Sequence, residues 1–461
     1  MSELTRIPVE PPAAQTMLLY GGTLVSMDPQ HRVLRDAEVL IHQGRIAAIG
    51  KSLTALPRTR ILDCTGCILM PGLVQGHVHL GQTFFRGLAE GRPLLSWLRE
   101  RIWPLEAAHD DESAYWCTLL GAAECLLSGT TTVQDIGIGP GARGLLAALA
   151  DSRLRAIAGK CLMDEGEELP AALREPADRL LAEAETLGSE FARGGREGRL
   201  RYALNPRFIL SCSDALWQGI AELAAKKLWP IHTHGLEQLP ETEIVRSLKG
   251  GRDEIEYFDD CGILDRDLRL AHGVWLGERH FPRLRDRRFS VVHCPGSNLK
   301  LGSGIADVVG LRREGIKVGL GCDGAACNNG LDAFAEVRLA ATLQQVKHGP
   351  AAFSGRDALA LATREGARAL GLEREIGSIE VGKRADLVIL ETGQPGAFAA
   401  PAADPHDLVC YSANGSWVRH VFIDGEQLVA DGRLVHFDLE TLRGQAERSC
   451  AELLRRSGVT L

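Results

Sequence analysis

The feature that most constrains the fold is a regular alternation of two residue patterns between residues 67 and 373. Short apolar runs typical of β-strands are separated by amphipathic stretches typical of helices, such as 112–129 and 214–227. This alternation predicts a parallel sheet covered by helices. Eight such units over about 300 residues favour a (β/α)8 TIM barrel over an open sheet. The eight runs are residues 68–80, 130–136, 155–163, 199–210, 229–234, 268–276, 289–295 and 316–323.

Both ends of the chain show a residue pattern that differs from that of the middle. Residues 17–63 and 377–435 read as short strands punctuated by turns, and residues 438–458 as one amphipathic helix. Two β-rich ends can pair into one unit. The sequence therefore predicts an α/β protein with two parts, a barrel of residues 73–373 and a small β-sandwich domain built from residues 1–72 and 374–461.

Charge and cysteine content narrow the class of partner and the compartment. The chain has 52 Lys and Arg against 60 Asp and Glu, a net charge of −8, which disfavours nucleic acid or an anionic membrane as the main partner. The first 20 residues lack the pattern of a secretion signal, and no apolar run is long enough to span a membrane. Of the cysteines, only Cys64 and Cys67 form a C-x-x-C, which we interpret as small buried side chains. The expected location is the cytoplasm.

A pair of histidines, His77 and His79, ends the first barrel run. Because strand residues two apart point to the same face, both imidazoles are expected to face the barrel interior. Two converging imidazoles suit zinc or iron. The pattern alone is weak, since buried histidines also pair by chance, and it gains meaning only when further ligands meet it.

Further polar side chains lie near the ends of later runs. The fifth run ends in His232 and His234, with Glu237 three residues on, while the sixth carries His272 and the eighth ends in Asp323. His234 is nearer the strand end and is the better ligand, so His232 is expected to pack one layer below. Active sites of such barrels lie at the C-terminal ends of the strands. The sequence therefore predicts one site that gathers these residues.

This set of residues favours hydrolytic chemistry. Three imidazoles and a carboxylate can bind one divalent ion together with a water, whose pKa the ion lowers from about 15.7 towards 7. Glu237 can take the proton of that water and pass it to a ring nitrogen or leaving group. His272 can hold the hydroxide or polarise the substrate, and Asp323 can help to move the second proton.

In barrel order these motifs resemble the amidohydrolase superfamily, in its mononuclear aminohydrolase branch of purine and nucleoside deaminases and s-triazine hydrolases. The resemblance covers nearly the whole chain, including residues 377–390. The motifs that carry it are His77-x-His79, His234-x-x-Glu237, Ala271-His272-Gly273 and Asp323.

The resemblance implies a role for each of these positions. Glu237 is implied as the proton shuttle and His272 as the residue that contacts water or substrate. One divalent metal is implied, with zinc expected and iron as the alternative. Its implied ligands are His77, His79, His234 and Asp323.

Binuclear members of the superfamily bridge two metals with a carbamylated lysine. Lys160 is the nearest candidate, but it precedes His234 by a long interval and lies on an early strand. A bridging lysine belongs at the end of the fourth strand. We therefore predict a structural role for Lys160, and the H-x-x-E that contains Glu237 favours the one-metal, deaminating type.

Other positions bear on the substrate, which Glu237 and His272 are also expected to contact. Gln82 offers a donor and an acceptor to a heterocycle edge, and Arg207 can bind a ring carbonyl or an anion; both resemble positions with which guanine deaminases hold the purine. Glu106 resembles the carboxylate with which adenosine-type deaminases of this branch bind ribose hydroxyls, although an exposed acid at a helix start fits the pattern equally well.

Residues 293–304 and 322–334 look most like bacterial deaminases that act on 5′-deoxyadenosine-type nucleosides. Within them Asn298 and Asn328 either contact substrate or cap turns, and Trp103, elsewhere in the chain, either lines the pocket or belongs to the core.

The favoured function is a metal-dependent hydrolytic deaminase of purine metabolism that acts on a C–N bond of a cyclic amidine. The first choice of substrate is an adenosine-type nucleoside such as 5′-deoxyadenosine or S-adenosylhomocysteine. The alternatives are a guanine, oxopurine or pterin deaminase and an s-triazine chloro- or aminohydrolase. A non-catalytic scaffold is disfavoured because all the implied ligands are present. The partner is then a small heterocycle, and the chain is compatible with a homo-oligomer.

Overall fold

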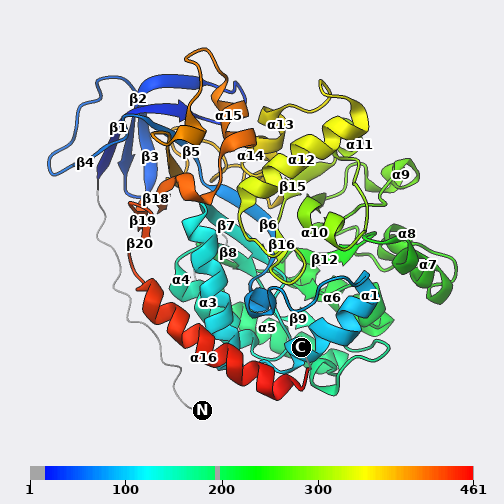
Figure 1. Ribbon diagram of the computed structural model, residues 1–461. Helices are drawn as coiled ribbons and strands as arrows, with labels where there is room; N and C mark the ends of the chain where they lie inside the picture. The colour runs from blue at the N-terminus through cyan, green and yellow to red at the C-terminus, as the bar shows by residue number, and fades with distance from the viewer. Residues whose placement is uncertain (1–15, 193–197, 460–461) are drawn as a thin grey trace.

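The computed structural model describes residues 16–192 and 198–459 (Figure 1). Predictions that concern residues 1–15, among them part of the expected lack of a secretion signal, lie outside the described residues. Each of the eight predicted runs contains a strand. The main strands are β6 (Leu73–His79), β7 (Thr130–Asp135), β8 (Arg155–Ala158), β10 (Leu200–Tyr202), β12 (Ile231–Gly235), β13 (Leu268–His272), β14 (Phe289–His293) and β15 (Lys317–Leu320).

These strands pair in parallel. One sheet has the order β10-β8-β7-β6-β16, where β16 (Asp323–Gly324) continues the eighth run, and another has the order β12-β13-β14-β15. A short pair joins β9 (Cys161–Leu162) to β11 (Asn205–Pro206), and a single parallel bridge links Leu204 to Ile231. Because β16 pairs with β6 through Asp323 and Val78, the ends of the first and eighth runs lie side by side.

The first predicted run is two strands instead of one. β5 (Cys67–Pro71) pairs with strands of the terminal sheet, and only β6 pairs with the parallel strands. Gly72 separates them, and a Cβ there would lie 2.2 Å from the side chain of Thr131. Only glycine lets the chain pass this closely between the two sheets.

Strands from both chain ends form one nine-stranded sheet, as the sequence texture suggested. Its order is β20-β19-β18-β17-β5-β1-β2-β3, with β4 paired to β1. The expectation of strands throughout 377–435 is wrong for its middle, where Asp404 caps the helix α15 (Pro405–Ser412). The remaining strands are β1 (Met17–Val25), β2 (Val33–His42), β3 (Arg45–Gly50), β4 (Arg60–Asp63), β17 (Leu387–Glu391), β18 (Val418–Ile423), β19 (Glu426–Ala430) and β20 (Arg433–Leu434).

The predicted amphipathic helices are present. Asp110 caps α3 (Asp111–Leu127) and Ser213 caps α6 (Asp214–Lys227). The C-terminal helix α16 (Leu439–Ser457) packs against α3 (Figure 1). The other α-helices are α1 (Leu94–Trp97), α2 (Trp103–Ala107), α4 (Ala142–Ser152), α5 (Ala177–Phe191), α7 (Leu239–Leu248), α8 (Glu254–Asp260), α9 (Phe281–Leu284), α10 (Pro295–Lys300), α11 (Val308–Arg313), α12 (Ala333–His348), α13 (Gly355–Leu361) and α14 (Arg364–Ala369).

The fold also bears on the C-x-x-C pair and on membrane-spanning helices. Cys64 and Cys67 are buried and free, as interpreted from the sequence. Within the described residues, no helix combines the length and the apolar character that crossing a membrane requires.

Candidate metal centre and pocket

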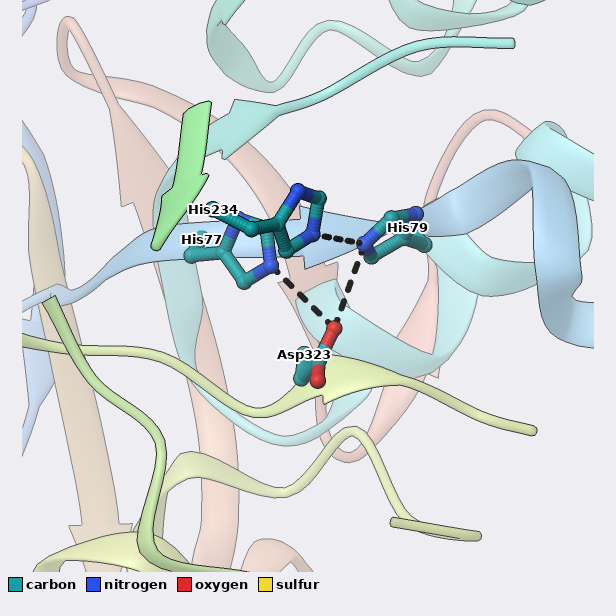
Figure 2. Close-up of side chains that lie close together, drawn as sticks. All are labelled: His77, His79, His234 and Asp323. Atoms are coloured by element: carbon teal, nitrogen blue, oxygen red, sulfur yellow. Dashed lines mark hydrogen bonds and ion pairs between the residues drawn. The ribbon is translucent and has the colours of Figure 1, made fainter. Parts of the chain in front are cut away.

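Three histidines and one aspartate converge where β6 and β12 end and β16 begins (Figure 2). Nε2 of His77 and Nε2 of His79 each lie 3.2 Å from Oδ1 of Asp323. Nε2 of His79 lies 3.1 Å from Nε2 of His234. One ligand atom from each of the four residues lies within 4.8 Å of the others, so the structure brings together all four predicted ligands.

The rings are held in place from outside the cluster. Nδ1 of His77 contacts Nε2 of His232 at 3.0 Å, which confirms that His232 packs one layer below the ligands. Nδ1 of His234 lies 2.6 Å from the backbone carbonyl oxygen of Arg207, to which it donates. Partners of this kind fix the tautomer and orientation of ligating imidazoles.

The electrostatics of the cluster suit a cation. Burial lowers the pKa of His77 and takes the pKa of His79 and of His234 well below the ordinary value. Burial acts to raise the pKa of Asp323, but contact with His77 and the nearby His79 outweigh it and hold that pKa well below its usual range. Three imidazoles thus face one carboxylate.

The hydrogen bonding of the ring nitrogens supports a divalent metal at this cluster. Because His234 donates through Nδ1, its Nε2 carries a bare lone pair, and this atom faces Nε2 of His79. Nε2 of His77 is buried and makes no hydrogen bond within the described residues. A buried ring nitrogen with a free lone pair is a metal-ligand atom, and three ring nitrogens with one carboxylate oxygen suit zinc or iron.

Local backbone geometry brings the eighth strand to the cluster. Asp323 has a φ of 63° and His272 a φ of 72°, in the left-handed region that few residues other than glycine adopt. Strain of this kind persists where the surrounding structure enforces it and is common at functional sites. Gly321 passes so close to β6 that a Cβ there would lie 2.5 Å from the carbonyl oxygen of His77.

Glu237 and His272 face each other beside the four ligands. Oε2 of Glu237 lies 3.4 Å from Nε2 of His272, which is 3.8 Å from Oδ2 of Asp323. Burial raises the pKa of Glu237, which favours a carboxyl group that can both take and give a proton. Asn298 holds Nδ1 of His272 at 2.8 Å and in this way turns Nε2 towards Glu237.

Three of the five residues predicted to contact substrate form one buried network. Gln82 donates through Nε2 to Oε1 of Glu106 at 2.8 Å, and Arg207 donates to both carboxylate oxygens of Glu106. Gln82 also contacts Nδ1 of His79 at 3.3 Å. Glu106 is 1% exposed, so its alternative interpretation as an exposed helix-start acid is wrong.

A small cavity of about 30 Å³ lies beside the metal ligands, which is room for one or two waters. Glu237, His272 and Arg207 line it, as do Glu241 and a set of apolar side chains. Sequence reasoning missed these apolar residues because their amphipathic spacing is equally typical of core. They are Leu94, Trp97, Leu98, Phe208 and Leu301.

Several open interpretations are now decided. Trp103 is buried in an apolar cluster and is not among the described residues that line the cavity. Asn328 holds a turn, since its Nδ2 donates to the carbonyl oxygen of Cys322 and to Glu336. Lys160 donates to Glu175 and Glu183, away from the ligand cluster, in keeping with the structural role predicted for it. Ser303, which sequence reasoning missed, donates to Glu237.

The chain is similar to known proteins in family, in sequence and in structure. Residues 68–428 match the amidohydrolase family. The chain is 38% identical to a 5′-deoxyadenosine deaminase of Methanothermobacter thermautotrophicus, over 91% of this chain and 95% of the relative. It is 36% identical to a 5-methylthioadenosine/S-adenosylhomocysteine deaminase of Syntrophobacter fumaroxidans, over 92% and 95%. A solved adenosine deaminase from Xanthomonas campestris, with bound zinc, superposes with a TM-score of 0.88 at 32% identity and covers 96% of this chain and all of its own.

Proposed function

The chain belongs to the amidohydrolase family and shares its TIM-barrel type of α/β fold, and from this premise we propose that it is a metal-dependent hydrolytic deaminase. The proposed reaction replaces the exocyclic amine of an adenosine-type nucleoside with oxygen and releases ammonia. One observation carries the proposal, namely that the four candidate ligands converge next to a buried pair of proton-transfer groups, Glu237 and His272.

The proposed metal ligands are Nε2 of His77, His79 and His234 and the carboxylate of Asp323. We propose one divalent ion, with zinc favoured by the nitrogen-rich donor set and iron as the alternative. When bound, such an ion supplies Lewis-acid polarisation and an ionisable water at neutral pH.

Proton transfer falls to the residues beside the ligands. Glu237 has a raised pKa because it is buried, so its carboxylate can accept a proton from water and return it to a ring nitrogen. Nε2 of His272 lies between Glu237 and Asp323 and can orient the attacking water or polarise the ring carbon being attacked. Asp323 can accept the second proton before ammonia leaves.

The choice of an adenosine-type nucleoside is supported by the relatives, whose names specify 5′-deoxyadenosine or 5-methylthioadenosine and S-adenosylhomocysteine. Gln82, Glu106 and Arg207 are the proposed contacts for the parts of the substrate that do not react. Glu106 still has about one free acceptor site in the network, because a carboxylate can accept about four hydrogen bonds and three reach it here.

Guanine or a related oxopurine is the second candidate substrate, and one observation favours it. Gln82 and Arg207, the two residues that can read a purine edge, both contact Glu106, so they form one prearranged set of donors beside the metal ligands. Pterins and s-triazines are further candidate substrates, because their rings carry a replaceable substituent and offer acceptors to the same donors.

An ammonia-release screen tests the proposed function. The metal-loaded wild-type chain is incubated with 5′-deoxyadenosine, adenosine, S-adenosylhomocysteine, guanine, a pterin and an aminated s-triazine, and the initial rates are compared. The proposal expects the highest kcat/KM for an adenosine-type nucleoside. A preference for guanine selects the second candidate, and no ammonia from any aminated ring contradicts the proposal.

The domain division remains a proposal. We propose a closed barrel of residues 73–373, supported by the parallel pairing of β16 with β6 and the bridge between Leu204 and Ile231. A β-sandwich domain of residues 1–72 and 374–461 is supported by the nine-stranded terminal sheet. Cytoplasmic location, assembly into a homo-oligomer and independence from nucleic acid and membranes are further parts of the proposal, and the net charge of −8 supports the last.

A further inference from the structure

The segment formed by α10 and the loop after it contacts both members of the proton-transfer pair. Its first contact is the amide of Asn298 with Nδ1 of His272, and its second is the hydroxyl of Ser303 with Oε1 of Glu237, at 3.2 Å. The backbone N–H of Ser303 donates to the carbonyl oxygen of Asn298 at 2.8 Å. One short segment thus fixes the relative position of Glu237 and His272.

The direction of the hydrogen bond at Ser303 is also fixed. The side-chain amide of Gln238 lies 2.9 Å from the carbonyl oxygen of Leu301, which can only accept, so the amide end at this place is Nε2. The same Nε2 lies 3.3 Å from Oγ of Ser303 and donates to it. The hydroxyl proton of Ser303 is therefore free to point at Oε1 of Glu237.

The position of Ser303 is well determined by its surroundings. The residue is 3% exposed, so water does not compete for its hydroxyl. Its carbonyl oxygen accepts a hydrogen bond from Nε1 of Trp275 at 3.2 Å. With both its backbone groups bonded, Ser303 presents Oγ to Glu237 at little further entropic cost.

We propose that Ser303 is a positioning residue that assigns different tasks to the two carboxylate oxygens of Glu237. It holds Oε1 as a hydrogen-bond acceptor, and Oε2, 3.4 Å from Nε2 of His272, is the oxygen that carries protons between water and substrate. This inference rests on the proposed function, since it concerns how the general acid–base group of that reaction is oriented.

The test compares Ser303→Ala with two matched variants in the metal-loaded enzyme. Ser303→Ala removes the donor, and we expect kcat to fall about 10- to 100-fold while KM stays within about twofold, because a misdirected acid–base group slows the chemistry more than it weakens binding. Ser303→Thr keeps a hydroxyl and should restore most of kcat. Ser290→Ala removes a buried hydroxyl that donates to Ala369, and it should leave kcat unchanged.

Two further readouts separate positioning from folding. Metal content and Tm of Ser303→Ala should match those of the wild type, because the hydroxyl contacts neither the ligands nor the core. A kcat of Ser303→Ala within about twofold of wild type, or a loss that Ser303→Thr does not restore, would overturn the proposal. Glu237→Gln is measured in parallel: if it is inactive while Ser303→Ala is fully active, only the positioning role fails, whereas an active Glu237→Gln contradicts the proposed function.

Discussion

One terminal nitrogen of Arg207 contacts both carboxylate oxygens of Glu106, at 2.8 and 2.7 Å, and both side chains are buried. The two residues come from distant parts of the chain, and Arg207 also lines the cavity. Each side chain compensates the charge of the other, which would be unfavourable if it were buried without a partner.

Removing one partner of this pair should therefore cost more than removing both. We expect Arg207→Met alone to lower the free energy of unfolding by about 3–5 kcal/mol, because Glu106 is then a buried and uncompensated charge. The double variant Arg207→Met with Glu106→Gln should recover a large part of that loss. Denaturant unfolding of the wild type, both single variants and the double variant measures the coupling, and strictly additive losses would contradict it.

A second buried ion pair connects the parallel strands to the terminal sheet. Arg155 on β8 donates to both carboxylate oxygens of Asp386, at 2.8 and 3.0 Å, and is 1% exposed. We expect Arg155→Met to destabilise the fold by about 3–5 kcal/mol. The matched control is Arg443→Met on α16, whose ion pair with Glu447 is exposed and should contribute within about 0.5 kcal/mol. Equal losses of Tm in the two variants would refute this account.

The lowered pKa of Asp424 is expected to make the free energy of unfolding depend on pH. Burial acts to raise its pKa, but Arg155, Arg199 and Arg384 outweigh it and lower that pKa to about 2. A carboxyl group with a depressed pKa in the folded state adds stability above its ordinary pKa of 3.8, and that stability is lost as pH falls from about 4 towards 2.

The size of the effect follows from this shift. At pH 7 wild type should exceed Asp424→Asn by about 2 kcal/mol in the free energy of unfolding, and the difference should shrink below pH 4. Urea unfolding at a series of pH values measures it. Glu440→Gln, which alters an exposed acid of α16, should stay parallel to wild type throughout. A constant difference between Asp424→Asn and wild type would contradict the prediction.

The small volume of the cavity bears on substrate entry. Its volume of about 30 Å³ is far below the roughly 300 Å³ or more that ligand pockets offer, so we expect the segment that carries Leu94, Trp97 and Leu98 to move when a nucleoside binds. Binding of a nucleoside analogue should change tryptophan fluorescence, and Trp97→Phe should abolish most of the change. Trp417→Phe, which alters a buried indole outside the cavity lining, should retain it. An unchanged signal in Trp97→Phe would show that this segment stays in place.

The metal ligands could be predicted from sequence because their signal is local. His77 and His79 follow the period of a strand, and barrel order alone brings His234 and Asp323 to the same end of the sheet. The strand runs and the long helices were predictable for the same reason. The extra break at Gly72 was not, since it depends on a contact with Thr131 in another strand.

The surroundings of Glu106 and Glu237 depend on contacts that no local pattern encodes. Arg207 is 101 residues from Glu106, so the burial of that acid could not be read from its own helix. Ser303 is 66 residues from Glu237 and reaches it only through the turn after α10. Polar residues in loops are equally typical of turn caps, and only the assembled fold distinguishes the two roles.

Glu237 is expected to transfer the first proton without taking part in metal binding, which falls to the four ligands of the same site. This division is tested most directly by measuring bound metal and ammonia release in the same preparations of wild type, Glu237→Gln and Asp323→Ala. We predict about one divalent ion per chain in wild type and Glu237→Gln, much less in Asp323→Ala, and ammonia release from 5′-deoxyadenosine by wild type alone. Full turnover by Glu237→Gln, or a wild type that binds no metal, would contradict the account.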